Sequence, residues 1–383
     1  MKIIKRDAPP LDLSPAESMP VREARPEDNE ALIALTNASP IRIGFGLMNI
    51  ERGNDYFALN RARGDVHVFV AEQEGEIVGA SAVTLREAVV GGAVKKVFYG
   101  GDLKVNPKVR KRKLGTKLSI AVFDRARELK ADFMIGIVSQ RNLPSMNLIT
   151  SHYGWEPARI CGRVITYSLR LQRRLKVERR YESGPPRPEE IPDLVKLHNE
   201  HYKHFNFHPR FTPESFTDML ERTPGYSLDD FLVARVDGKP VAMAGLWDIA
   251  QCKQVVIKSY RRPIAVGIRI LKAVLSILRI KFWIPEAGKP WEIGYLRHYA
   301  AHRDHLPALS QLVREHCQQS HDQHRFRYLS VTFHHKDRTR LVVRRIPRHQ
   351  ARNLFGYCPI HDPERMDALV DDDAPYFEDL ALA

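Results

Sequence analysis

Cysteine and long apolar runs are both scarce in this sequence. Its 383 residues include four cysteines, none in a C-x-x-C pair, which argues against a disulfide scaffold or a cysteine zinc site and favours a reduced, cytoplasmic chain. No run of about 18 uncharged apolar residues is present, so we expect no membrane-spanning helix. The first 20 residues lack the apolar core of a signal peptide, and we expect a flexible leader there.

Metal-binding patterns are also missing, although the chain has 16 histidines. The stretch LHNEHYKHFNFH places His198 and His201 three residues apart, and His204 and His208 follow. These residues lack the carboxylate or cysteine spacing of a known metal motif. We therefore predict no metal site, and assign the histidines to packing, to the surface or to contacts with a substrate.

Positive charge is abundant. The formal net charge of +14 favours an anionic partner, whether nucleic acid, an acidic membrane surface or a phosphorylated small molecule. The densest basic run, KVRKRKLGTK, lies between a strand pattern that ends before Pro107 and a helix pattern that begins near Gly115. Because a helix N-terminus offers unpaired backbone N–H groups and a partial positive charge, this placement favours a phosphate cradle over a nucleic-acid patch.

Strand and helix patterns alternate along the chain, which predicts a mixed α/β sheet of the α+β kind. The pattern FVAEQEGEIVGAS returns as LVARVDGKPVAMA, and each copy follows an acidic helix start, RPEDNEALIALTN or RPEEIPDLVKLHN. This spacing of about 160 residues predicts two copies of one domain. We expect a leader at 1–20, domains at 21–180 and 181–360 joined by a linker near Tyr181–Pro188, and a mobile acidic tail at 361–383.

The basic stretch LKVNPKVRKRKLGTKL resembles the acetyl-coenzyme A motif of the GNAT (GCN5-related) N-acetyltransferases, L-x-V-x-P-x-x-R-x-x-G-x-G. Lys113 replaces the first glycine of that pattern. The downstream stretch NLPSMNLITSHYGW and the order of elements from 21 to about 171 are similar to the same family. The motif positions that match are Leu103, Val105, Pro107, Arg110 and Gly115.

The resemblance implies two tandem GNAT-like domains and an N-acyltransferase that uses acetyl-CoA or another acyl-CoA. It places the pyrophosphate on backbone N–H groups of the basic turn, the pantetheine along 103–105, and a backbone N–H near Leu103 against the oxyanion. An acceptor amine then attacks the thioester directly through a tetrahedral intermediate. The residues expected to hold the cofactor are Leu103, Lys104, Val105, Arg110, Lys111, Arg112, Lys113, Leu114, Gly115, Thr116 and Asn142.

The resemblance also bears on the proton-transfer groups. Ile149 occupies the position of the tyrosine that the family often uses as acid, so Tyr153 and His152 are the nearby candidates. Asp102 and Tyr99 lie on the cofactor strand and are candidate bases that would act through water.

The second half carries a weaker version of the same pattern. Its stretch EIGYLRHYAAHRDHLPALSQLVREH lacks the glycine and the Arg-x-x-Gly spacing, which predicts a degenerate copy. The resemblance to tandem members of the family implies that this copy shapes the acceptor site. The segment 264–284 is apolar except for one narrow face, and we expect a helix buried between the domains. Peripheral membrane contact or binding of a long acyl chain are the alternatives. The polar face consists of Arg269, Lys272, Ser276 and Arg279.

Together these features predict an N-acyltransferase that acts on the primary amine of a small molecule or peptide. The first alternative is a long-chain acyltransferase that takes its acyl group from CoA or from an acidic acyl carrier protein. The second is a nucleic-acid-binding protein with a vestigial cofactor fold, which is disfavoured because the basic run lacks interleaved aromatic residues.

Overall fold

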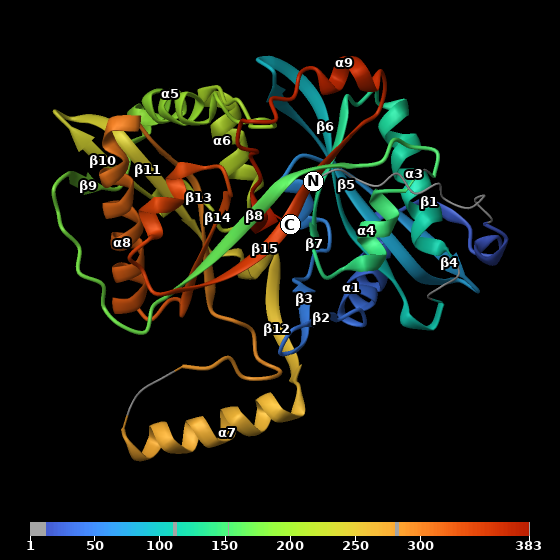
Figure 1. Ribbon diagram of the computed structural model, residues 1–383, viewed down its shortest axis with the longest axis horizontal. Helices are drawn as coiled ribbons and strands as arrows, with labels where there is room; N and C mark the ends of the chain where they lie inside the picture. The colour runs from blue at the N-terminus through green and yellow to red at the C-terminus, as the bar shows by residue number, and fades with distance from the viewer. Residues whose placement is uncertain (1–12, 110–112, 152, 280–282, 383) are drawn as a thin grey trace.

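The computed structural model describes residues 13–109, 113–151, 153–279 and 283–382. A twelve-stranded sheet runs through the molecule in the order β1-β4-β5-β6-β7-β15-β8-β14-β13-β11-β10-β9, and helices pack on it (Figure 1). A three-stranded sheet, β12-β3-β2, accompanies it. The prediction of a mixed α/β fold is confirmed.

The first half of the chain occupies one side of the large sheet. Val68 and Val70 of β4 face α1, whereas Phe69 between them faces α3, because successive strand residues point to opposite faces. The strands are β1 (Val21–Glu23), β2 (Ile41–Ile43), β3 (Gly46–Arg52), β4 (Asp65–Gln73), β5 (Glu76–Val90), β6 (Ala93–Val105), β7 (Phe133–Ser139) and β8 (Arg159–Arg170). The helices are α1 (Asn29–Asn37), α2 (Ala58–Arg61), α3 (Leu114–Glu128) and α4 (Leu143–Ile149).

The second half follows the same plan. Leu232 and Ala234 of β10 face α8, and Val233 faces α5. The strands are β9 (Glu182–Gly184), β10 (Phe231–Val236), β11 (Lys239–Trp247), β12 (Lys253–Tyr260), β13 (Ile293–Ala301), β14 (Tyr328–His334) and β15 (Arg348–Pro359). The helices are α5 (Ile191–Tyr202), α6 (Pro213–Arg222), α7 (Arg262–Ile277), α8 (Leu306–Asp322) and α9 (Pro363–Asp367).

The two hairpins that repeat in the sequence have the same backbone geometry. Glu74–Gly75 and Asp237–Gly238 all have positive φ angles, of 53°, 81°, 49° and 73° in chain order. Positive φ at both central residues is what a two-residue hairpin turn of type I′ requires. In each hairpin the strand register also shifts at one place, after Ala71 in the first and after Ala234 in the second.

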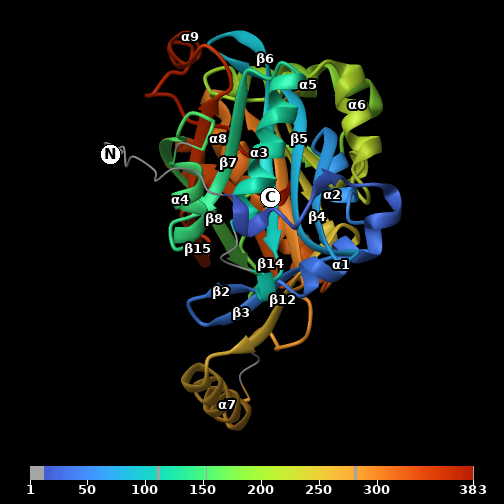
Figure 2. The same ribbon diagram turned by 90° about the vertical axis from the view of Figure 1, so that its right-hand side faces the viewer.

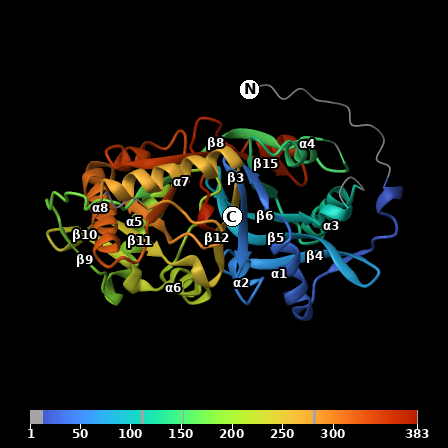
Figure 3. The same ribbon diagram turned by 90° about the horizontal axis from the view of Figure 1, so that it is seen from below.

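The last strands of the two halves are exchanged. β8 pairs with β14 of the second half from Val164 to Arg170, whereas β15 pairs with β7 of the first half. β8 and β15 also pair with each other, antiparallel, where the two halves meet (Figure 3). Each half therefore completes its part of the sheet with a strand from the other.

Two expected flexible segments are structured. Residues 13–20 are packed rather than free: Ala16 and Met19 are buried, and Lys117 Nζ donates to both of their carbonyl oxygens at 2.9 Å. The rest of the predicted leader lies outside the described residues. The expected linker at Tyr181–Pro188 contains the edge strand β9, because its backbone pairs with β10.

The acidic tail is docked, which corrects the expectation of a mobile segment. α9 lies within it, and the following chain runs between the halves with Tyr376 and Glu378 buried. The backbone N–H of Phe377 donates to the carbonyl of Asn206 at 2.9 Å. Buried apolar side chains and paired carboxylates thus fix the tail against the protein, although its acidic composition alone predicted a solvent-exposed segment.

α7 also corrects an expectation, because the helix expected to be buried between the domains is exposed. None of its residues is buried, and it stands away from the body beyond the end of β12 (Figures 1 and 2). Among the described residues, no helix has both the length and the apolar content needed to cross a membrane.

Candidate functional site

β6 and β7 separate where a cofactor slot is predicted. Their parallel pairing ends at Tyr99 and Ile135, whereas β6 continues along β5 to Val105. Beyond Tyr99, no described strand pairs with the edge of β6 that faces β7. An extended ligand can therefore lie along 100–104 as an additional strand would.

Asp102 occupies a bulge in β6 within this slot. The pairing of β5 with β6 shifts register between Ala80 and Ala82, and Asp102 has a φ of 50°. A bulge next to an active site redirects the backbone and interrupts regular pairing locally. It does so here at Asp102 and Leu103, where a backbone N–H is predicted to stabilise the oxyanion.

The first turn of α3 lies at the end of the same strand. The helix begins at Leu114 after Lys113, whose φ is 55°. A Cβ atom added at Gly115 would lie 3.7 Å from Leu103, so the surroundings are open enough for a ligand to approach the backbone. The first N–H groups of a helix have no intrahelical acceptor and suit phosphate, so this turn fits the pyrophosphate of an acyl-CoA. The predicted cofactor residues Arg110, Lys111 and Arg112 lie outside the described residues.

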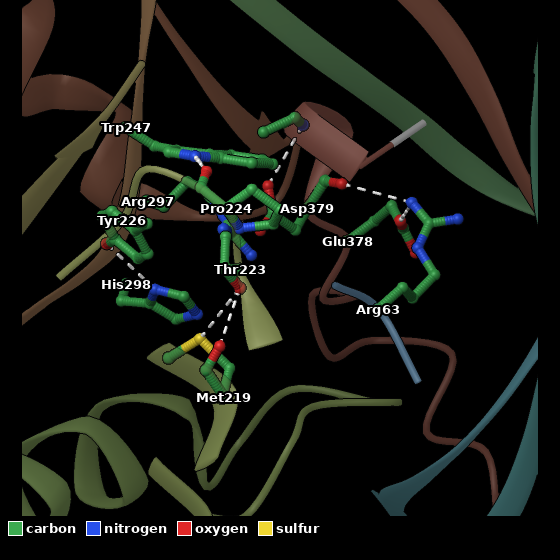
Figure 4. A network of polar contacts seen from close by, with 11 residues as sticks. Arg63, Met219, Thr223, Pro224, Tyr226, Trp247, Arg297, His298, Glu378 and Asp379 are labelled. Atoms are coloured by element: carbon green, nitrogen blue, oxygen red, sulfur yellow. Dashed lines mark hydrogen bonds and ion pairs between the residues drawn. The ribbon is translucent and has the colours of Figure 1, made fainter. Parts of the chain in front are cut away.

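Buried charged side chains surround the bulge. Arg52, at the end of β3, forms an ion pair with Asp102. Arg63, which follows α2, places its guanidinium 3.3 Å from the ring centroid of Tyr99. Its Nη2 also donates to Oε1 of Glu378 in the C-terminal segment at 3.3 Å (Figure 4). The tail thus reaches the strand on which the cofactor is expected.

The C-terminal segment contributes a second carboxylate to this cluster. Asp379 accepts from Nε of Arg297 on β13 at 2.5 Å (Figure 4). Arg86 lies 3.9 Å from Glu378. Burial raises the pKa of Glu378 even though the charges of Arg63 and Arg86 oppose the shift. The cluster is therefore strongly desolvated, and each charge in it depends on its partner.

Asp102 and Tyr99, the two predicted bases, differ in their protonation state at neutral pH. Burial acts to raise the pKa of Asp102, but the charges of Arg52, Lys104 and Lys253 prevail and hold it below its usual value. Asp102 is therefore an ionised, weakly basic ion-pair partner. Burial raises the pKa of Tyr99 to about 12, so its phenol stays protonated at neutral pH.

Lys253 was not found by sequence analysis. It is buried on β12, directly opposite Arg52 in the β3–β12 pairing, and its Nζ lies 5.5 Å from the ring centroid of Tyr295. Burial, followed by the positive charges of Arg52 and Arg63, lowers its pKa to about 7. A lone lysine in a strand pattern carries no signal, because only the pairing of β12 with β3 brings it near the cofactor strand.

Asn142 and Tyr153, two further predicted site residues, lie apart from this cluster. Asn142 caps α4, where its Oδ1 accepts from the backbone N–H of Ser145 at 3.3 Å. Tyr153 packs its ring against Trp155, with 5.7 Å between centroids, in the core beneath α3. Tyr99 belongs to a different core, which includes residues of β7 and β15 together with Phe207 and Tyr376. His152 lies outside the described residues.

The second half has a matching divergence, and the tail fills it. The parallel pairing of β13 with β14 ends at Tyr295 and Ser330, and His298 has a φ of 45° at a register shift of β13. Residues 376–381 lie against these diverging strands. The cavity left between them is about 30 Å³, room for a water molecule or two but not for an extended cofactor.

The model of the acetyltransferase (GNAT) family matches residues 43–155. This segment runs from β3 to the residues just after α4 and includes both the β6–β7 slot and the start of α3. A search of curated protein sequences found no match.

Solved structures with the same fold cover most of the chain. A GCN5-related N-acetyltransferase from Sphaerobacter thermophilus matches with a TM-score of 0.58 and 13% identity, over 90% of this chain and 97% of that one. Saccharomyces cerevisiae N-myristoyltransferase with bound myristoyl-CoA matches with a TM-score of 0.58 and 11% identity, over 93% and 85%.

A third similar structure is the GCN5-related glucosamine N-acetyltransferase region of a fungal multi-domain GH3 beta-N-acetylglucosaminidase. Its TM-score is 0.59 and its identity 17%, over 88% of this chain, which spans 38% of that protein's length. Such low identities establish the common fold, whereas the family rests on the matched segment. The match over residues 43–155, a segment that contains the β6–β7 slot, confirms the predictions of a GNAT domain, of an acyltransferase and of an acyl-CoA donor. The tandem second copy remains a prediction.

Proposed function

We propose that this chain transfers an acyl group from acyl-CoA to an amine of a small molecule or peptide. The observation that carries this proposal is the divergence of β6 from β7 beside the start of α3, with a bulge at Asp102. Acyl-CoA supplies an activated thioester. The amine acceptor is inferred from the family and from the N-acetyltransferases and N-myristoyltransferase of similar fold.

Backbone groups hold the donor in this proposal. The strand residues Leu103, Lys104 and Val105 bind the pantetheine, and the backbone of Lys113 to Thr116 binds the pyrophosphate. The backbone N–H at the bulge faces the thioester oxygen and stabilises negative charge as it develops there. The roles of Arg110, Lys111, Arg112 and Asn142 remain predictions.

Lys253 is the proposed proton acceptor. A base works best when its pKa lies near the operating pH, and the pKa of Lys253 is lowered to about 7. The neutral amine of Lys253 takes the proton that the acceptor amine loses on attacking the thioester carbon. Tyr99, which remains protonated, is the proposed donor to the leaving thiolate, and the Arg52–Asp102 ion pair positions Lys253 electrostatically.

The second half is proposed to be a copy of the first that has lost cofactor binding. The matching turns, register shifts and strand order support duplication. The tail segment that lies in its β13–β14 divergence supports the loss. On this proposal the second half lends Lys253 and Arg297 to the site, while a single acyl-CoA binds per chain.

Thermal shift with acetyl-, succinyl- and palmitoyl-CoA tests the proposal. We expect at least one donor to raise the melting temperature of the full chain, and the preferred donor indicates the acyl length. Gly115→Glu should abolish the shift by placing a negative charge at the pyrophosphate, while a Cβ there meets only an ordinary contact. Gly184→Glu, at an open position on β9, is the matched control. The absence of a shift with every donor would contradict the proposal.

A further inference from the structure

α7 is an exposed helix that stands apart from the body of the protein (Figure 1). It follows β12, whose far end carries it away from both halves (Figures 1 and 2). None of its sixteen residues is buried. Ile277 and Ile270 expose 81% and 60% of their surface, so apolar side chains that normally form a core face solvent here.

The sequence of α7 separates apolar from basic residues. At 100° per residue, one broad face carries the large apolar side chains and the remaining face carries the cations Arg262, Arg269 and Lys272. No acidic residue occurs between 261 and 285. The exposed apolar residues of the helix are Ile264, Val266, Ile270, Leu271, Val274 and Ile277.

We propose that α7 docks this protein on the surface of an anionic lipid bilayer. A helix of sixteen residues is about 24 Å long, too short to cross a hydrocarbon core of about 30 Å, so it lies in the plane of the interface. Its broad apolar face inserts among the acyl chains, and the flanking cations contact anionic headgroups. This inference does not depend on the proposed transfer reaction.

The charge pattern favours lipid over a second copy of the chain. Two α7 helices that met through their apolar faces would leave the cations on the outer side of each helix, and α7 itself has no acidic residue with which to pair them. Within the described part of the chain, Lys272 of α7 forms an ion pair with Glu286, which lies beyond the helix, at 3.5 Å. An anionic bilayer satisfies the apolar face and the uncompensated charge at once.

Vesicle co-sedimentation of the full chain tests this docking. The vesicles contain phosphatidylcholine alone or phosphatidylcholine mixed with phosphatidylglycerol. We expect binding to the mixed vesicles that weakens as salt is added, and little binding to phosphatidylcholine. The triple variant I270E/V274E/I277E should bind at least about tenfold more weakly, because it places carboxylates on the inserted face.

A matched control separates insertion from net charge. V94E/V236E/L341E adds the same three negative charges at exposed apolar positions outside α7 and should bind like the wild type. The melting temperature of both triple variants, followed by scanning fluorimetry, reports whether they fold. Failure of the wild type to bind anionic vesicles overturns the proposal, as does equal binding of the two variants. A dimer in light scattering that I270E/V274E/I277E dissociates, without vesicle binding by the wild type, would assign α7 to self-association instead.

Discussion

Lys113 shows at the level of one residue why the related motif prefers glycine. Its φ of 55° lies in the left-handed region, which glycine enters without cost and which other residues enter at a cost of about 1–2 kcal/mol. The substitution in the motif therefore leaves the turn geometry in place. It stores strain at the start of α3, beside the proposed pyrophosphate site.

We predict that Lys113→Gly is neutral to stabilising by up to about 1 kcal/mol, because relief of strain is partly offset by the greater chain entropy of unfolded glycine. Acyl-CoA should still raise the melting temperature, because the backbone N–H groups remain. Lys130, with a φ of 52° just after α3, is the control, since Lys130→Gly should stabilise similarly without altering the acyl-CoA shift. Loss of the shift in Lys113→Gly alone would assign the donor contact to the lysine side chain.

The buried amine of Lys253 should make both the stability of the fold and the proposed reaction depend on pH. Its folded pKa of about 7 lies below the unfolded value of about 10.4, so charging it destabilises the folded state. Stability linked to this group therefore rises as pH increases from about 7 towards 10.

We predict that kcat/KM rises with pH through about 7 and that Lys253→Met loses this limb along with most activity. Lys253→Met should also be more stable than the wild type below pH 7, a difference that fades as pH approaches 10. Lys258→Met, on the exposed side of the same strand, should retain the limb. An unchanged pH profile in Lys253→Met would remove it as the base, because titration of the acceptor amine alone would then explain the limb.

At the scale of elements, the C-terminal segment decides how the two halves meet. Glu378 and Asp379 neutralise arginines from β5, β13 and the loop after α2, and all of these side chains are largely buried. Removing one partner of such a cluster leaves a charge without compensation.

We predict that Glu378→Ala lowers the free energy of unfolding by about 3–5 kcal/mol, because Arg63 and Arg86 stay buried without their carboxylate. Chemical denaturation followed by circular dichroism measures the loss. Glu364→Ala, at an exposed position on α9, should change stability by less than about 0.5 kcal/mol. Equal effects of the two substitutions would mean that the tail contributes little to the fold.

At the scale of the whole molecule, the exchange of β8 and β15 makes the folding of each half depend on the other. Without β15, the edge of β7 is uncovered, and without β8 the edge of β14 is uncovered. Uncovered edge strands offer unpaired backbone groups and promote aggregation. The halves should therefore be interdependent, despite their similar plans.

We predict that fragments 1–180 and 181–383 aggregate when expressed separately and form a soluble complex when expressed together. Size-exclusion chromatography with light scattering measures the outcome, and the acyl-CoA shift of the complex reports a restored site. A monomeric, folded fragment 1–180 that binds acyl-CoA would show that β8 can take the place of β15 beside β7.

Much of the fold was predictable because its signals are local. The Glu74–Gly75 and Asp237–Gly238 pairs predicted two hairpins, and the basic run before Gly115 predicted the start of α3. The position of the Asp102 bulge and the environment of Lys253 were not predictable, since both depend on pairing between strands distant in sequence. The burial of α7 was predicted wrongly, because an apolar composition does not reveal whether another element covers it.

The sequence by itself determined the alternation of strands and helices, the turn that precedes α3 and the family of residues 43–155. The elements follow from periodicity and turn residues within a few tens of residues, whereas the family follows from the resemblance of a short motif. Only the tertiary structure decided which half receives β8 and β15, that the tail enters the second half's divergence, and that Lys253 lies beside Arg52. Those outcomes depend on contacts between segments distant in sequence, where burial and charge pairing outweigh local preference.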